Sequence, residues 1–208
     1  MKRYLYDNQG IALVTALMMT LISMAIIMTL LYVMTASTQR SGAAKRYHSV
    51  LEAANGGAVL VVKDLMPYLM NQFQSYTSSQ VINNAKTDFA GVSLETTTAD
   101  CLKSKMYQNT ANWPTSCNAT FNPKTLPDVT MTLQATSNTP FTVYAKIVDT
   151  IVGNSDTSGS RLEDGSGAAY NSATTTPMPF PYMYRLEVQG ERQRNSIEKS
   201  NISVLYAY

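Results

Sequence analysis

The pattern of apolar and polar residues begins with a long apolar run near the start of the chain. From Ile11 to Met34 there are 24 residues without a charge, a proline or a glycine. A helix of that length is about 36 Å long, enough to cross a hydrocarbon core of about 30 Å. The run therefore predicts a membrane-spanning helix over residues 11–38. The alternatives are a buried core helix, which this globule would have to surround on all sides, and a cleaved secretory signal, whose apolar region is only about 7–15 residues long.

Downstream of this run, apolar residues recur at the period of a helix. Their spacings are four, three, four and four, which places them on one stripe of a helix surface. We expect an amphipathic helical half over residues 39–73, with Pro67 kinking it or marking a boundary. The stripe consists of Val50, Ala54, Gly57, Val61 and Leu65. The residues expected to face water include Arg46, Glu52, Asn55, Lys63 and Asp64.

From Asp128 onward the apolar residues alternate with polar ones. Four segments show this period of two, which is typical of half-buried strands in an antiparallel sheet. They are residues 128–135, 141–148, 182–189 and 201–208. Such a sheet needs a cover on its apolar face, and the stripe of the long helix is suited to provide one. The sequence thus predicts an α+β fold in which a long N-terminal helix packs on a four-stranded antiparallel sheet.

The remaining segments are connections. Residues 74–127 are rich in Ser, Thr and Asn, and we expect a largely irregular connection with a short helix or strand, pinned by the cysteine pair. A hairpin-length link at 136–140 joins the first two strands, and a longer polar hairpin at 190–200 joins the last two. The Gly/Ser/Thr-rich segment 153–181 has two interpretations that stay open, a mobile surface loop and a specific contact surface.

The chain has two cysteines, Cys101 and Cys117, separated by sixteen positions. Two thiols do not make a zinc site by themselves, and there is no CxxC pair. In an exported domain such a pair predicts one disulfide that closes a loop. Two unpaired thiols are the alternative.

Composition and motifs argue against catalysis and against nucleic-acid binding. The net charge is only +2, and no run of Lys and Arg exceeds two residues. Nucleotide-binding, metalloprotease and hydrolase motifs are missing from the sequence, so we expect no enzyme, no cofactor and no metal. Asp156, Ser158 and Ser160 have the alternate spacing of a calcium loop, but Arg161 stands where such a loop needs glycine. The single histidine, His48, is expected to be a solvated helix residue.

The charges that flank the apolar run do not determine its orientation. Lys2 and Arg3 precede the run, while Arg40, Lys45 and Arg46 follow it. The positive-inside rule therefore slightly disfavours a cytoplasmic N-terminus.

The quoted segments "QGIALVTALMM" and "LEAANGGAVLVV", with the closing "YRLEVQG…SVLYAY", carry a family resemblance. A short basic leader, a glycine and a hydrophobic helix that becomes amphipathic resemble the class III signal sequences of type IV pilins and type II secretion pseudopilins. Within that group the chain is similar to PilX-type minor pilins. The resemblance implies that residues 1–10 are a leader, which prepilin peptidase cuts between Gly10 and Ile11 on the cytoplasmic face. It also implies methylation of the new N-terminus and export of residues 74–208 as a globular domain. Lys2 and Arg3 then belong to the leader, which resolves the orientation.

One position departs from the pattern of the major pilins. They have a glutamate at the fifth mature position, where this chain has Thr15. A carboxylate there is costly in a bilayer and is tolerated because it pairs with a neighbouring subunit's amino terminus. Thr15 cannot form that ion pair, although its hydroxyl can bond to its own helix backbone. The hypothesis that follows is a minor subunit, placed at the filament tip, where the usual pairing is not required.

The resemblance implies a non-enzymatic subunit that initiates or caps type IV pilus assembly. Its expected partners are other major and minor pilins, prepilin peptidase, the inner-membrane assembly platform and a PilY-type tip adhesin. Its expected location is the bacterial inner membrane, with the globular domain outside the cytoplasm, and then the extracellular pilus. Three alternatives stay open: a minor pseudopilin of a type II secretion system, a single-pass membrane-anchored sensor or binding module, and a membrane-anchored hydrolase.

Overall fold

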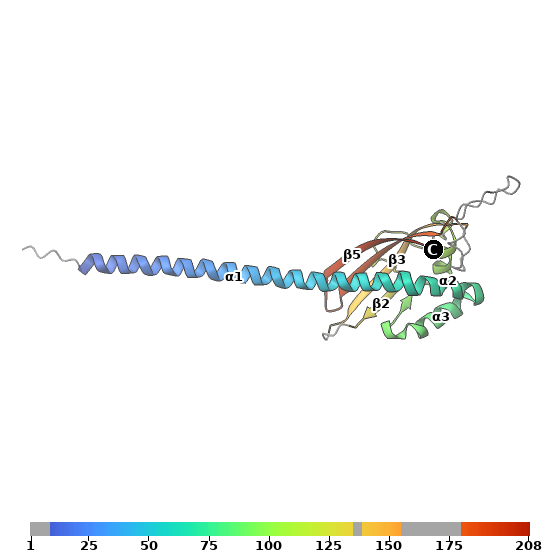
Figure 1. The fold of residues 1–208 in the computed structure, drawn as a ribbon, viewed down its shortest axis with the longest axis horizontal. Coiled ribbons are helices and arrows are strands. Elements are labelled where there is room, and N and C mark those ends of the chain that lie inside the picture. The colour runs from blue at the N-terminus through green and yellow to red at the C-terminus, as the bar shows by residue number, and fades with distance from the viewer. Residues whose placement is uncertain (1–8, 135–138, 155–179) are drawn as a thin grey trace, which may run out of the picture. The chain divides into compact units, whose positions relative to one another are not determined.

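The structure is a computed structural model that describes residues 9–134, 139–154 and 180–208 (Figure 1). The chain divides into two compact units between Arg46 and Tyr47. Most of the predicted leader and most of the 153–181 segment, with the candidate calcium loop, lie outside the described residues.

The first unit contains the N-terminal part of helix α1 (Gln9–Leu60). A window of this helix has a mean hydropathy of 2.5 and none of it is buried, so by length and composition the helix could cross a membrane. Threonine hydroxyls within the helix donate hydrogen bonds to carbonyl groups three or four residues earlier. Those threonines are Thr15, Thr20, Thr29, Thr35 and Thr38. The bonds satisfy polar groups that would otherwise be costly in an apolar environment.

The second unit begins within α1, and here the predicted stripe is confirmed. Val50, Ala54 and Leu65 are completely buried, and Gly57 and Val61 are buried beside them. The helix continues past Pro67 because it widens to a π-helix, η1 (Val61–Leu65), in which the Met66 amide donates to the Val61 carbonyl. Helix α2 (Met66–Ser75) follows with Pro67 in its first turn, where an amide hydrogen is not needed by the helix. Pro67 therefore follows the change from π-helix to α-helix and does not end the helical run.

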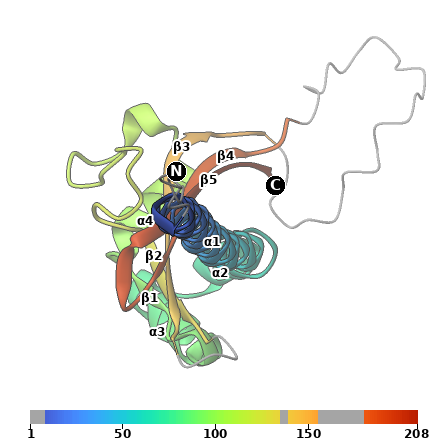
Figure 2. The same ribbon diagram turned by 90° about the vertical axis from the view of Figure 1, so that its left-hand side faces the viewer.

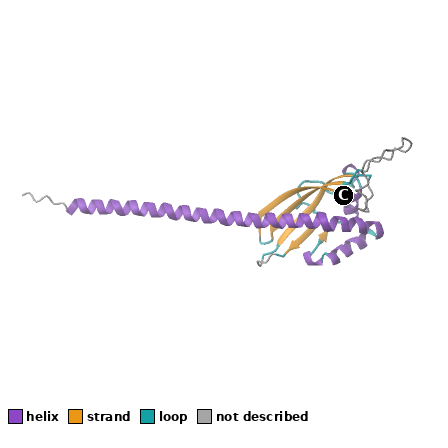
Figure 3. Ribbon diagram, in the orientation of Figure 1, coloured by secondary structure: helices purple, strands orange, loops and turns teal. Residues whose placement is uncertain are grey.

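The sheet is antiparallel, as predicted, but it has five strands and not four (Figure 3). Their order in space follows the sequence: β1 (Glu95–Thr96), β2 (Val129–Leu133), β3 (Phe141–Ile151), β4 (Met183–Arg192) and β5 (Asn195–Ala207). The extra strand, β1, is two residues long and pairs with β2. A strand of two residues is too short to show a period of two in the sequence.

The predicted long hairpin over residues 190–200 was wrong. Strand β4 runs to Arg192 and β5 begins at Asn195, so only two residues separate them. Glu191 is opposite Lys199 in the ladder, and its carboxylate lies 2.9 Å from the Lys124 ammonium. Polar residues in this stretch therefore extend the ladder and do not form a loop.

The prediction of a largely irregular path over residues 74–127 was also wrong. The segment contains α3 (Ser78–Asp88) and α4 (Ala99–Tyr107), together with the short 3-10 turns η2 (Ala90–Val92) and η3 (Thr110–Asn112). The start of α3 is stabilised by the Gln80 side chain, which accepts hydrogen bonds from the Thr77 amide and hydroxyl. Each longer helix buries an apolar pair four residues apart, Val81 with Ala85 and Leu102 with Met106.

The long helix approaches the sheet closely at two glycines. A Cβ atom built on Gly57 would lie 2.6 Å from Val143 Cγ1, and one built on Gly190 would lie 3.0 Å from the Ala54 Cβ. The first contact joins the helix to β3 and the second joins it to β4. Glycine on one side of each contact lets the backbones approach, as the packing of a helix on a sheet requires here.

Candidate functional site

The most prominent feature of the first unit is the uncovered apolar surface of α1. Every large apolar side chain from Ile11 to Met34 is more than half exposed. A helix that is apolar all round is normally surrounded by hydrocarbon or by other protein. This surface is the candidate assembly surface of the chain.

The predicted processing position lies at the beginning of this helix. The backbone of Gly10 is helical and stands one residue after the start of α1 at Gln9, and Ile11 follows with an exposed side chain. The first four amide groups of a helix have no partners within it, so the first turn opens most easily. Glycine lowers the helix preference of that turn further.

Thr15 lies on the apolar surface one turn beyond Ile11. Its hydroxyl lies 3.1 Å from the carbonyl oxygen of Ile11 and 3.0 Å from that of Ala12. The expected bond between this hydroxyl and its own helix is confirmed. The side chain at this position is therefore uncharged, and its hydroxyl is hydrogen-bonded within its own helix.

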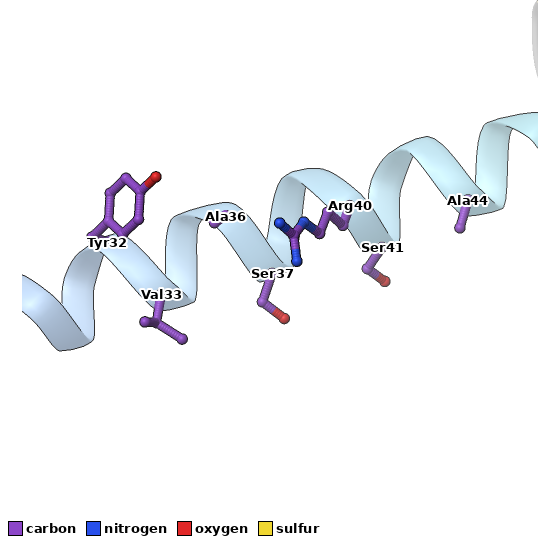
Figure 4. Close-up of a pocket in the computed structure, with 7 residues that line it drawn as sticks. All are labelled: Tyr32, Val33, Ala36, Ser37, Arg40, Ser41 and Ala44. Carbon is purple, nitrogen blue, oxygen red and sulfur yellow. The ribbon is translucent and has the colours of Figure 1, made fainter.

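The end of the apolar run is marked by a change in side-chain size and polarity (Figure 4). Ser37, Ser41 and Ala44 point to the same side of the helix, and Arg40 is the first ionisable group after Tyr32. Tyrosine is common at the level of lipid headgroups, where its ring and hydroxyl meet different surroundings. Tyr32 and Arg40 thus form a polar border to the candidate assembly surface.

In the second unit, Cys101 and Cys117 form the predicted disulfide, with their Cα atoms 5.5 Å apart. Cys101 lies on α4, and Cys117 lies in the loop that leads to β2. The bridge therefore fixes that loop to a helix that packs into the core through Leu102 and Met106.

Beside the disulfide is a buried ion pair that the sequence did not predict. The Lys105 ammonium, on α4, lies 2.8 Å from both carboxylate oxygens of Asp128 and also donates to the carbonyls of Asn118 and Ile147. Asp128 in turn accepts a hydrogen bond from the Ile147 amide. Burial lowers the pKa of Lys105 and raises that of Asp128, while the attraction between the two charges opposes both shifts. The Lys105 ammonium and both oxygens of the Asp128 carboxylate have hydrogen-bond partners, and we infer that these bonds keep both groups charged.

A second buried lysine, Lys146, completes this cluster from β3. Its ammonium donates to the Asn118 side chain at 2.6 Å, to the Thr120 hydroxyl at 3.0 Å and to the Thr125 carbonyl at 2.7 Å. Burial lowers the pKa of Lys146, and the neighbouring Lys105 lowers it further. The hydrogen bonds of the two lysines hold the loop of residues 117–128 against the sheet, so the role of this cluster is structural.

A group of tyrosines links the end of the sheet to the helices. Tyr184 is buried on β4, and its hydroxyl donates to the Met106 carbonyl at 2.8 Å. The Tyr107 hydroxyl donates to the Met70 carbonyl, also at 2.8 Å. Burial raises the pKa of Tyr107 to about 12 and raises that of Tyr184 further. The tyrosine hydroxyls are therefore hydrogen-bond donors that join α2, α4 and β4.

The residues that the structure describes contain no group of three or more His, Cys, Asp or Glu side chains that could hold a metal ion. His48 is exposed, as predicted, and its Nδ1 lies 3.2 Å from the Glu52 carboxylate one turn away.

Comparison with models of known protein families, with curated proteins and with solved structures finds no match to this chain.

Proposed function

We propose that the chain is a minor pilin, a non-enzymatic subunit that is processed by prepilin peptidase and initiates or caps assembly of a type IV pilus. The observation that supports this best is the nature of α1. One uninterrupted helix is apolar and uncovered over Ile11–Met34 and then supplies the buried stripe that covers an antiparallel sheet. Such a helix suits a subunit that is first held in a bilayer and then packed among similar helices.

The start of α1 supports the processing step. Gly10 lies in the first helical turn, and apolar residues continue directly after it. Opening that turn costs few hydrogen bonds and would present an extended backbone to a protease at the membrane surface. The product would begin at Ile11, with residues 1–10 removed and the new amino group methylated.

Thr15 supports a special place in the filament. Its hydroxyl is bonded to its own helix, so it presents no charge to the amino terminus of a neighbour. A subunit without that charge is best placed at the tip, where no ion pair with a neighbouring subunit's amino terminus is required. There it would contact other minor pilins and a PilY-type adhesin, while the assembly platform and the inner membrane hold it beforehand.

The intact mass of the membrane-extracted protein tests processing directly. We expect a chain that lacks residues 1–10 and carries one methyl group on Ile11. A chain that still begins at Met1 would exclude the pilin assignment and would favour a membrane-anchored binding module.

Gly10→Leu should leave the precursor uncut. The matched control is Gly42→Leu, the same substitution in the same helix, where an added Cβ meets nothing within 4 Å. Normal cleavage of both variants would argue against the cut site.

Immunogold labelling tests the position at the filament tip, because uniform labelling along filaments would contradict it. A deletion strain that keeps its pili and loses protein secretion would point to a pseudopilin.

A further inference from the structure

Strand β5 forms an open edge of the sheet. It is the last strand in the order β1-β2-β3-β4-β5, and it is thirteen residues long (Figure 2). Tyr182 and Tyr208 exchange both backbone hydrogen bonds, at 3.0 and 2.9 Å. The register then continues without a break from Met183–Ala207 to Glu191–Lys199.

This register determines which backbone groups point outward. In an antiparallel ladder, hydrogen-bonded and non-hydrogen-bonded pairs alternate. Counting from the Tyr182–Tyr208 pair, the even-numbered residues from 200 to 206 bond to β4. The odd-numbered residues therefore direct their amide and carbonyl groups away from the sheet. They are Lys199, Asn201, Ser203, Leu205 and Ala207.

Over residues 201–207 the edge lacks the charges, prolines and bulges that usually prevent pairing with another strand. Proteins protect long edges with charges, prolines, bulges or a covering element. From Asn201 to Ala207 the strand has no charged residue, no proline and no glycine, and its register has no bulge. Leu205 is 83% exposed on its outer face. Among the described residues no strand pairs with this edge.

An apolar groove of about 210 Å³ follows the same edge on the core side of the sheet. Ile202 and Val204 of β5 form one wall, and Val59 and Val62 of the helix form the other. Val59 is 50% exposed there. A strand added beside β5 would lie about 4.8 Å further out, so its inward side chains would enter this groove.

We propose that β5 and this groove are a docking site for an extended segment of a partner polypeptide, which adds to the sheet as a sixth strand. The backbone of the segment pairs with Asn201, Ser203 and Leu205, and apolar side chains at alternate positions fill the groove.

Charge indicates one further property of the segment. Lys63 lines the groove, is exposed, and makes no ion pair within the described residues. The segment should therefore carry a carboxylate near one end. Strand β5 of a second copy fits this requirement poorly, because its one acidic residue, Glu198, already lies 3.6 Å from Arg192 Nε of its own chain. The site is independent of leader cleavage, which the intact mass measures separately.

Amide hydrogen exchange of the full-length chain in detergent micelles, resolved by NMR, tests the proposal. The probe is a synthetic peptide of alternating valine and threonine with an aspartate at each end. Its control has the same composition with the valines placed consecutively. At ten times its dissociation constant the probe should slow exchange at Asn201, Ser203 and Leu205 by about tenfold. The amides of Ile202 and Val204 already bond to β4 and should not change.

Two variants locate the interaction. Asn201→Pro removes an outward amide hydrogen and should abolish binding, whereas Asn201→Ala keeps that hydrogen and should bind normally. Val59→Lys should block the groove without touching the edge. Its matched control is Tyr76→Lys, at a position that is equally exposed, 50%, and lies outside the groove.

Three results would overturn the proposal. One is exchange that stays fast at all three outward amides with millimolar probe. Another is normal binding by both Asn201→Pro and Val59→Lys. The third is protection of the outward amides without peptide that rises with protein concentration, because that result would assign the edge to a second copy of this chain.

Discussion

The neighbouring glycines Gly56 and Gly57 provide a sharp test of the helix–sheet contact. Both lie within α1, so replacing either with alanine should favour the helix by about 1 kcal/mol. A Cβ on Gly56 meets nothing within 4 Å, whereas one on Gly57 would lie 2.6 Å from Val143 Cγ1 and 3.2 Å from Val143 Cβ. Val143 is completely buried and branched at Cβ, so it cannot turn aside.

The expected effects therefore have different signs. Gly56→Ala should raise the free energy of unfolding by about 1 kcal/mol. For Gly57→Ala the same helix gain is opposed by overpacking that costs about 1–3 kcal/mol, so the net change is between zero and a loss of about 2 kcal/mol. The assay is urea unfolding of the full chain in micelles, followed by the fluorescence of Trp113, the single tryptophan.

A double-mutant cycle isolates the contact. Val143→Ala removes two methyl groups and should by itself destabilise by about 2 kcal/mol. Combined with Gly57→Ala it should cost less than the sum of the two, because the new methyl group enters the vacated space. Equal stabilisation by Gly56→Ala and Gly57→Ala, or simple additivity in the cycle, would refute the close packing of α1 on β3.

Three further predictions concern the second unit. Replacing Cys101 and Cys117 with serine should lower the free energy of unfolding by about 3 kcal/mol on the loop-entropy model. Urea midpoints measured with and without reductant provide the check: reductant should destabilise the parent chain by the same amount and leave the serine variant unchanged. Lys105→Met should destabilise by about 3–5 kcal/mol because it leaves the Asp128 carboxylate buried without its ion-pair partner. The double variant with Asp128→Leu should recover most of that loss, and no recovery would contradict the assignment of the loss to the unpaired carboxylate. Burial raises the pKa of Tyr184 above its ordinary value of 10.0, so the unfolded state ionises first and the free energy of unfolding should fall as the pH rises above 10. Tyr184→Phe should make that fall shallower, and an unchanged slope would assign it to other groups.

The sequence predicted well those elements in which the pattern of apolar and polar side chains matches the buried and outward faces. The stripe from Val50 to Leu65 and the alternation in the four longer strands both reflect one face packed on the core and one face that carries polar side chains. Thr15 and the cysteine pair were also readable, because a back-bonded hydroxyl and a short disulfide loop depend on neighbours close in sequence.

The elements that were missed have signals too short or too polar to read. Helices α3 and α4 each bury an apolar pair four residues apart, which is fewer positions than a periodicity needs. The tight β4–β5 hairpin was hidden because Glu191 and Lys199 are polar and yet pair within the ladder. Polarity alone therefore did not distinguish a loop from the end of a strand whose polar side chain, Glu191, is buried and paired with Lys124.

The sequence by itself determined the long helix, its apolar first part and the half-buried strands, because burial periodicity is a local property of a segment. Only the tertiary structure decided the rest. Lys105, Asp128 and Lys146 come from three separate segments, and their burial is affordable only because folding brings their hydrogen-bond partners together. The open edge of β5 and the groove beside Val59 likewise depend on strand order, which no single segment encodes.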